Sequence, residues 1–207
     1  MNIVQKVIPI FRNFSKPIIV SCSGGADSLA LLHFMNYKDR KTKALFVHHN
    51  TECSVNSLKV VKDYCSLYNI ELIVRHIDGV YTVNKEHNWR QERYKIFHSF
   101  TDHYLMTAHH LDDQVEQYLM SSIKGKSTLI PYRNNNIHRP FLYLTKETIL
   151  EYCRYHSIKY YDDPDNYNES NNRAITRNQI VPLALKINPG LYTTVERLVR
   201  NSTHVWK

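Results

Sequence analysis

The chain has 207 residues, of which 43% are hydrophobic and only 5 are glycine, a composition that excludes fibrous and low-complexity proteins and fits one domain with at most a small appendage. No apolar run reaches the roughly 18–20 residues of a membrane-spanning helix, and residues 1–10 lack the basic segment and long apolar run of a secretory signal. The 27 basic and 19 acidic residues give a net charge of +8, which favours a nucleic-acid partner without requiring one.

Short apolar runs alternate with amphipathic stretches along the first two thirds of the chain. The runs predict buried strands at residues 17–20, 44–47, 71–74 and 104–107. The stretches between and after them predict helices at residues 28–37, 54–68, 89–100 and 112–123. Strands that alternate with helices predict a parallel sheet with helices on both faces, which is the doubly wound α/β class.

The remaining residues are more polar. Residues 124–138 predict a surface loop, and residues 145–156 predict a helix with Thr145 as its N-cap. A polar, Asn-rich loop is expected at residues 162–172, followed by two short helices at residues 174–185 and 191–205. We therefore predict a nucleotide-binding domain over residues 1–144 and a helical C-terminal extension over residues 145–207.

The four cysteines are scattered along the sequence and form no CxxC pair. This spacing argues against a zinc ribbon and, unless distant thiols converge, against an iron–sulfur cluster. Reduced thiols are the simpler interpretation, and they indicate a cytoplasmic protein. The residues concerned are Cys22, Cys53, Cys65 and Cys153.

The segment Ser23-Gly24-Gly25-Ala26-Asp27-Ser28 stands between a predicted strand and a predicted helix. Adjacent glycines let backbone N–H groups approach an anion, and the helix start adds its unpaired N–H groups and dipole. Ser23 and Ser28 can donate to phosphate oxygens, whereas Asp27 would repel a bare phosphate and therefore indicates a bridging Mg²⁺. The alternative is an ordinary Gly-Gly turn with Asp27 as N-cap. The Gly-Lys-Ser/Thr ending of a Walker A loop is absent.

A second polar cluster lies in residues 107–116, where a predicted strand ends and a helix begins. His109, Asp113 and Glu116 are spaced by four and three residues, which predicts one shared helix face. Such a face can hold a cation, orient a nucleophile or accept a proton. Alternatively, Asp112 and Asp113 are simply favourable charges at a helix N-terminus. A zinc site that includes His109 and His110 is less favoured, because the spacing matches no standard zinc motif.

These two segments carry a family resemblance. Residues 23–28 resemble the SGGxDS loop of the PP-loop ATP pyrophosphatases, which cleave ATP between its α and β phosphates. Residues 107–116 resemble the AHHxxDQxE signature of the tRNA(Ile)-lysidine synthases. Further matches follow in that family's order between residues 18 and 189: Val47-His48-His49-Asn50, Trp89-Arg90-Gln91-Glu92-Arg93-Tyr94, Arg139-Pro140-Phe141-Leu142, Asp163-Pro164-Asp165-Asn166, and then Arg173, Arg177 and Pro182.

Members of this family adenylate the wobble cytidine of an isoleucine tRNA and then attach free lysine to it. The resemblance implies the use of ATP and Mg²⁺, L-lysine as substrate, and a tRNA with a CAU anticodon as partner. It implies contacts with ATP by Ser23, Gly24, Gly25, Ala26, Asp27, Ser28, Val47, His48 and Arg93. It also implies metal binding by Asp27 and Asp113, and catalytic roles for Asp27, His109, Asp113, Glu116, Arg173 and Arg177. Arg90 and Arg139 are further candidates for contact with nucleotide or RNA.

The chain also departs from the family pattern. His48 replaces an Asp, Asp165 replaces a Ser, and the Gly-rich loop after the carboxylate helix keeps only Gly125. Many members continue into further C-terminal domains, so we expect a short form that binds tRNA weakly, uses another RNA or relies on a partner. Two alternatives stay open. One is another tRNA-modifying enzyme of the same chemistry, such as a thiolase, and the other is a catalytically silent module that binds RNA or nucleotide.

Overall fold

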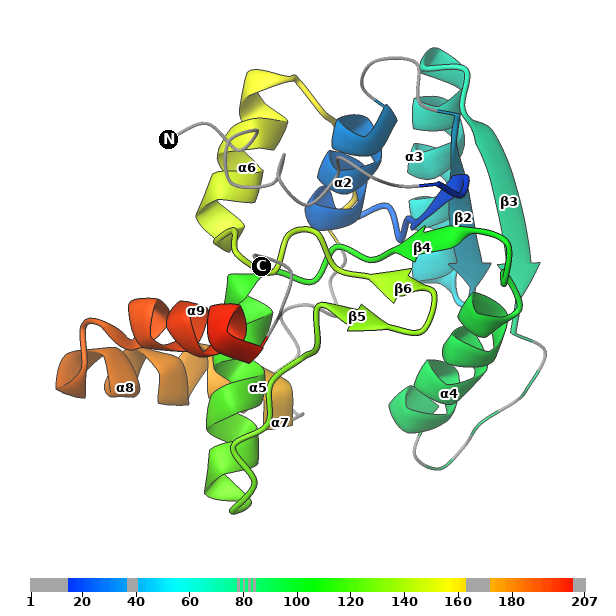
Figure 1. Ribbon diagram of the computed structural model, residues 1–207. Helices are drawn as coiled ribbons and strands as arrows, with labels where there is room; N and C mark the ends of the chain where they lie inside the picture. Colours follow the sequence, from blue (N-terminus) through cyan, green and yellow to red (C-terminus); the bar gives the residue numbers. More distant parts are fainter. Residues whose placement is uncertain are drawn as a thin grey trace.

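A six-stranded sheet forms the centre of the protein in the computed structural model, which describes residues 15–36, 41–77, 79, 81, 83, 85–162 and 172–202 (Figure 1). The strand order is β3-β2-β1-β4-β6-β5. All strands run parallel except β5, which pairs antiparallel with β6. The strands are β1 (Ile18–Ser21), β2 (Thr42–His48), β3 (Glu71–His76), β4 (Tyr104–Met106), β5 (Arg133–Asn134) and β6 (Ile137–His138).

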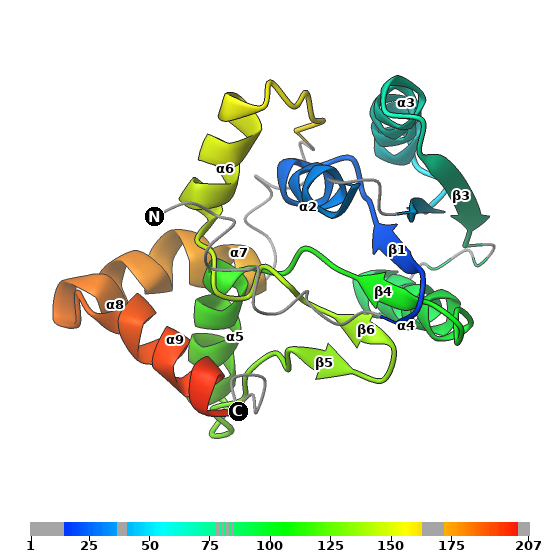
Figure 2. The ribbon, with the colours of Figure 1, turned by 45° about the horizontal axis from the view of Figure 1, so that its top comes forward.

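Helices cover both faces of this sheet, as the doubly wound prediction requires (Figure 2). Helices α2, α3 and α6 pack on one face and α4 packs on the other. The chain builds outward from β1 to β3 and then returns to place β4 on the other side of β1. Open α/β sheets bind ligands at such a reversal, beyond the carboxyl ends of the strands. The helices here are α2 (Ala26–Asn36), α3 (Glu52–Leu67), α4 (Lys85–His98) and α6 (Lys146–Tyr155).

The central strands are apolar on both sides, because each side faces a helical layer. In β1, Ile18 and Val20 join the core beneath α2, α3 and α6, whereas Ile19 joins the core beneath α4. Phe46 and Val47 of β2 divide between the two cores in the same way. This arrangement explains why uninterrupted apolar runs, rather than alternating ones, predict these strands correctly.

A third core lies beside the sheet and is built around α5 (Leu111–Ile123). Leu191, Val195 and Val199 form an apolar stripe at four-residue spacing along one helix and pack into this core. The helix is α9, and the segments that precede it run across α5 (Figure 1). They are α7 (Asn172–Ile175), the π-helical turn η3 (Thr176–Ile180), α8 (Val181–Ile187) and α9 (Leu191–Ser202). The domain boundary at residue 144 stays a prediction; α6, just after it, shares the core of α2.

Residues 124–138 are not all a surface loop, and the prediction is wrong at their C-terminal end. Ile137 and His138 are buried and form β6 beside β4. The Asn136 side-chain amide fixes this segment by donating to the carbonyls of Phe97 at 2.9 Å and Phe100 at 3.1 Å. A two-residue strand among asparagines has no recognisable apolar pattern, so the sequence does not predict it.

The helix predicted at residues 174–185 is divided into α7, η3 and α8. Pro182 lies at the start of α8 and has no N–H to donate to the carbonyl four residues earlier, which accounts for the wider π turn before it. Thr145 caps α6 as predicted, since its hydroxyl accepts from the Thr148 N–H at 3.2 Å.

Some predictions fall outside the described residues. They are the helix ends at residues 37 and 205 and most of the Asn-rich loop, with its Asp163-Pro164-Asp165-Asn166 match. Within the described ranges, no helix is long and apolar enough to cross a membrane.

Candidate active site

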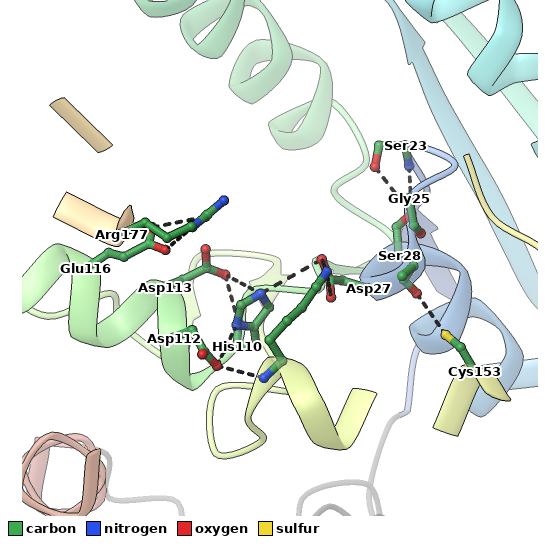
Figure 3. Close-up of polar contacts among 12 residues, drawn as sticks. Ser23, Gly25, Asp27, Ser28, His110, Asp112, Asp113, Glu116, Cys153 and Arg177 are labelled. Carbon is green, nitrogen blue, oxygen red and sulfur yellow. Dashed lines mark hydrogen bonds and ion pairs between the residues drawn. The ribbon is translucent and has the colours of Figure 1, made fainter. Parts of the chain in front are cut away.

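The Gly-Gly loop connects β1 to α2 and is held in one conformation by local contacts. Gly24 has a φ of +87°, and a Cβ at this position would lie 2.9 Å from the Ser57 carbonyl oxygen. Both facts require glycine. The Ser28 hydroxyl accepts from the Ser23 N–H at 3.1 Å and donates to the Gly25 carbonyl at 2.9 Å (Figure 3). Ser28 therefore stabilises the loop conformation by hydrogen bonds to two loop residues.

A cleft of about 450 Å³ opens between this loop, the end of β4, α4, α5 and the α7–η3 segment. It lies at the carboxyl ends of β1 and β4, where the strand order reverses. Nine of the predicted site residues line it: Ser23, Gly25, Asp27, Ser28, Arg93, His109, Asp113, Arg173 and Arg177. The structure thus brings the two sequence clusters to opposite walls of one cavity.

Asp27, at the start of α2, pairs with a lysine that the sequence analysis did not single out. Lys146 Nζ donates to both carboxylate oxygens of Asp27, at 2.6 and 2.7 Å. Lys146 is the first residue of α6, where a positive charge opposes the helix dipole. This unfavourable charge is the feature of the sequence that could have identified Lys146, because a lysine at a helix N-terminus suggests an acidic partner elsewhere.

His110 lies between three carboxylates (Figure 3). Its Nε2 is 3.9 Å from Asp27 Oδ2 and 3.7 Å from Asp113 Oδ2, and its Nδ1 is 3.4 Å from Asp112 Oδ2. Burial alone would lower the pKa of His110, but attraction by Asp113, Asp112 and Asp27 outweighs it and raises the pKa above the usual value. The three carboxylates favour the protonated imidazole, which links the loop wall to the α5 wall. The sequence had marked this residue only as a possible zinc ligand.

Asp113 and Glu116 share one face of α5, as their spacing predicts, and both hold arginines. Arg173 donates to Asp113 and, through Nε, to Glu116 at 2.7 Å. Arg177 Nε donates to Glu116 at 2.5 Å. Burial would raise the pKa of Asp113, but the positive charges of His110 and Arg173 lower it to about 2. Asp113 is therefore ionised at neutral pH.

His109 lies on the cleft side of the same turn, with its Nδ1 3.0 Å from the Thr107 hydroxyl. Burial lowers its pKa to about 3; Asp113 opposes this shift, and Arg139 adds to it. The imidazole is neutral at physiological pH and can accept a hydrogen bond. So low a pKa makes it a weak base, and the pKa of about 2 makes Asp113 no stronger a base while His110 and Arg173 face its carboxylate.

Other predicted residues do not reach the cleft with their side chains. Val47 packs in the core beneath α4, and His48 is buried at the end of β2, where its Nδ1 accepts from the Asn50 N–H at 3.0 Å. Gly24 contributes only its backbone, whose carbonyl accepts from the Tyr161 N–H at 2.9 Å. The Ala26 side chain packs in the core beneath α2. Glu116 stands behind its two arginines, 2% exposed.

The remaining candidate arginines have different surroundings. Arg93 lines the cleft, and burial lowers its pKa. Arg90 lies over the Tyr94 ring at 4.9 Å. Arg139 is only 2% exposed and donates to the Pro131 carbonyl at 2.6 Å and to the Tyr94 hydroxyl at 3.2 Å. Arg139 is thus held inside the protein, and its contact with nucleotide or RNA stays a prediction.

Comparison with known proteins agrees with this geometry. Residues 2–184 match the PP-loop domain family. The chain belongs to this family. A tRNA(Ile)-lysidine synthase from Haemophilus ducreyi is 31% identical over 90% of this chain and 46% of the relative. One from Oceanobacillus iheyensis is 31% identical over 87% of this chain and 44% of the relative. The predicted resemblance is thus confirmed, and the chain spans about half the length of these PP-loop relatives.

Among solved structures, a U34-tRNA thiolase from Methanococcus maripaludis with its [4Fe–4S] cluster superimposes with a TM-score of 0.78. The alignment covers 96% of this chain and 76% of the thiolase at 21% identity. At that identity the likeness establishes the PP-loop fold alone. The α/β prediction is therefore confirmed by both sheet topology and structural similarity.

Proposed function

We propose that this PP-loop protein is an ATP-dependent ligase of the tRNA(Ile)-lysidine synthase type. It would adenylate the wobble cytidine of an isoleucine tRNA with a CAU anticodon and attach L-lysine to it, releasing pyrophosphate and AMP. The names of its 31% identical relatives support this proposal. The observation that carries it is the cleft itself, where the Gly-Gly loop faces Asp113, and where Arg173 links Asp113 to Glu116 behind it.

The loop wall suits the adenylation step. The backbone around Gly24 and Gly25 and the N-terminus of α2 offer N–H groups to the phosphates that leave as pyrophosphate. Arg93 lines the same cleft and supplies positive charge. The oxygen on carbon 2 of cytidine would attack the α phosphate of ATP, and the bond to the β phosphate would break.

Mg²⁺ fits the donors at this wall. Asp27 and Asp113 approach His110 Nε2 from two sides, and carboxylate oxygens are the ligands that Mg²⁺ prefers. Lys146 Nζ lies 2.6 Å from Asp27 Oδ1, so Mg²⁺ would displace this ammonium or share the carboxylate with it. We infer that Asp27 and Asp113 would hold the metal, which when bound shields the charge of the departing pyrophosphate.

The α5 wall suits the second step. Asp113 and Glu116 bind guanidinium groups here, so they can equally recognise the ammonium group of lysine once Arg173 and Arg177 give way. The lysine must attack as a free amine. A carboxylate of this wall would accept its proton, with His109 as a neutral hydrogen-bond acceptor, while the new carbon–nitrogen bond forms and the bond to AMP breaks.

Sulfur transfer is disfavoured by the thiols nearest the cleft. Cys22, Cys65 and Cys153 are buried, and burial raises their pKa values to about 11, 12 and 11. These thiols stay protonated at neutral pH, whereas the thiolate is the reactive form.

The test is incorporation of radiolabelled lysine into total tRNA with ATP and Mg²⁺. Wild-type protein should label tRNA, and Asp27→Ala should not, while Lys59→Gln on the exposed face of α3 should behave as wild type. Labelling with sulfur instead of lysine would identify a thiolase. Absence of both labelling and ATP–pyrophosphate exchange would identify a silent binding module.

A further inference from the structure

The described residues form a second pocket, of about 430 Å³, at the opposite end of β4 from the cleft. Its lining contains four basic or potentially basic side chains and no acidic one. We call it the basal pocket and define it by Lys16, His98, Thr101, His103, Tyr104, Arg133, Asn135 and Asn136. Nothing in the proposed chemistry of the cleft uses these residues.

The positive charges of the basal pocket are not neutralised within the described part of the chain. Lys16 Nζ donates to the Thr101 carbonyl at 3.0 Å, and Arg133 Nε donates to the Asn135 carbonyl at 3.0 Å. Among the described residues, neither cation forms an ion pair with a carboxylate. Asp102 is close in sequence but does not line the pocket. Unneutralised cations around a hollow favour an anion.

The pocket is fixed by the same contacts that place β6. Asn136 donates to the Phe97 carbonyl in the last turn of α4 and to the Phe100 carbonyl just after it, and its side-chain oxygen lies 3.3 Å from His98 Nδ1. The Asn136 carbonyl also accepts from the Leu105 N–H at 2.9 Å. The turn that carries Arg133 is therefore anchored to both α4 and β4, so a ligand would meet a formed site and not a loose loop.

One face of α4 connects the basal pocket to the cleft. Arg90, Tyr94 and His98 follow one another at four-residue spacing, with Arg90 4.9 Å above the Tyr94 ring and the Tyr94 and His98 rings 6.1 Å apart. Tyr94 lines the cleft, and His98 lines the basal pocket. A polymer with regularly spaced phosphates can follow this face and touch both sites.

We propose that the basal pocket binds a backbone phosphate of the RNA whose target nucleotide occupies the cleft. The inference rests on the proposed function for the identity of the RNA. Lys16 and Arg133 contact the phosphate, and the two histidines donate to it when protonated. The pocket holds the RNA in position without touching the reacting base, because phosphate contacts fix register and base contacts supply specificity.

The experiment measures the affinity of total tRNA for the full chain over a range of NaCl concentrations. Each phosphate contact contributes about 0.7–0.9 to the slope of log K against log salt. The double variant Lys16→Gln/Arg133→Gln removes the contacts to one phosphate and should therefore reduce the slope by about 0.7–0.9. The matched control is Lys59→Gln/Lys62→Gln, which removes the same charge from the exposed side of α3 and should leave the slope unchanged.

An unchanged slope in the Lys16/Arg133 variant, or an equal reduction in the control, overturns the proposal. Failure of wild-type protein to bind tRNA overturns it as well. NMR shifts of His98 and His103 on addition of ATP or inorganic phosphate, but not of tRNA, would assign the pocket to a small anion instead. A reduced slope in a protein that incorporates no lysine would keep the basal pocket and reject the proposed function.

Discussion

The two walls of the cleft satisfy their polar groups in different ways. On the loop wall, neutral hydrogen bonds among Ser23, Gly25 and Ser28 hold the backbone, all within six residues. On the α5 wall, Asp113 and Glu116 are held by Arg173 and Arg177, which come from 57 to 61 residues further along the chain. The Ser23–Ser28 turn is therefore held by local contacts, although Lys146 and Tyr161 also bond to this wall, whereas the α5 carboxylates keep their arginine partners only when the C-terminal helices are folded.

The two walls also differ in the protein groups that a ligand must displace in order to bind. An anion approaching the loop meets backbone N–H groups in a preformed turn. A cationic substrate approaching α5 must compete with two guanidinium groups that already neutralise the carboxylates. We therefore expect ATP to bind without lysine or RNA, and lysine to bind well only after Arg173 and Arg177 have other partners.

The largest effect is expected on the α5 wall. Asp113→Asn should lower the rate of lysine incorporation by about 10²-fold or more, because an amide can neither accept the proton of the amine nor neutralise a cation. The variant should still fold, since the lost charge pairing is smaller than the roughly 5–15 kcal/mol stability of a typical domain. Initial rates with labelled lysine measure this.

The matched control for that variant is Glu147→Gln, the same acid-to-amide change at an exposed position of α6 outside the cleft. It should keep the wild-type rate. A wild-type rate in Asp113→Asn as well would remove this carboxylate from the mechanism.

A smaller effect is expected on the free energy of unfolding, and it depends on pH. The pKa of Asp113 is about 2 in the folded protein and about 3.9 in an unfolded chain, so its ionisation stabilises the fold above pH 4. That contribution, roughly 2.6 kcal/mol, is lost as the pH falls through 2. The free energy of unfolding should therefore differ between wild type and Asp113→Asn at pH 7, and the difference should shrink towards pH 2.

Urea denaturation at a series of pH values measures this difference. The difference in unfolding free energy between wild type and Asp113→Asn could instead be constant over the acid range. That result would show that the surroundings do not lower the pKa of Asp113. Glu147→Gln again serves as the comparison, and its expected gap is only the small dipole contribution of an exposed carboxylate in the first turn of α6.

The smallest effect belongs to the loop wall. Gly24→Ala should destabilise the fold by about 1–2 kcal/mol, because an L residue resists a φ of +87° and the new Cβ meets the Ser57 carbonyl. Gly25→Ala should cost much less stability, since its Cβ would meet only the Ser23 hydroxyl oxygen, at 3.8 Å. Thermal denaturation of both variants would test this, and equal losses would contradict the local account of the loop.

The same contrast explains what the sequence could predict. The glycine loop and the Asp113–Glu116 spacing are local patterns, so residues close in sequence identify them. The Asp27–Lys146 pair joins positions 119 residues apart, and its only local sign is a lysine at a helix N-terminus, which does not identify the partner. His109 and His110 are identical neighbours, and only the fold decides which ring lies among carboxylates. Strand β6 is missed because two residues are too few for a periodic signal.

The Asp112 carboxylate links three helices outside the cleft. It accepts from the Lys146 N–H at 2.7 Å and from the Tyr192 hydroxyl at 2.9 Å, and so joins the first turns of α5 and α6 to α9. Opening of α9 therefore removes a hydrogen-bond donor from the carboxylate next to Asp113. We therefore expect amide hydrogen exchange in α9 to slow when ATP is bound.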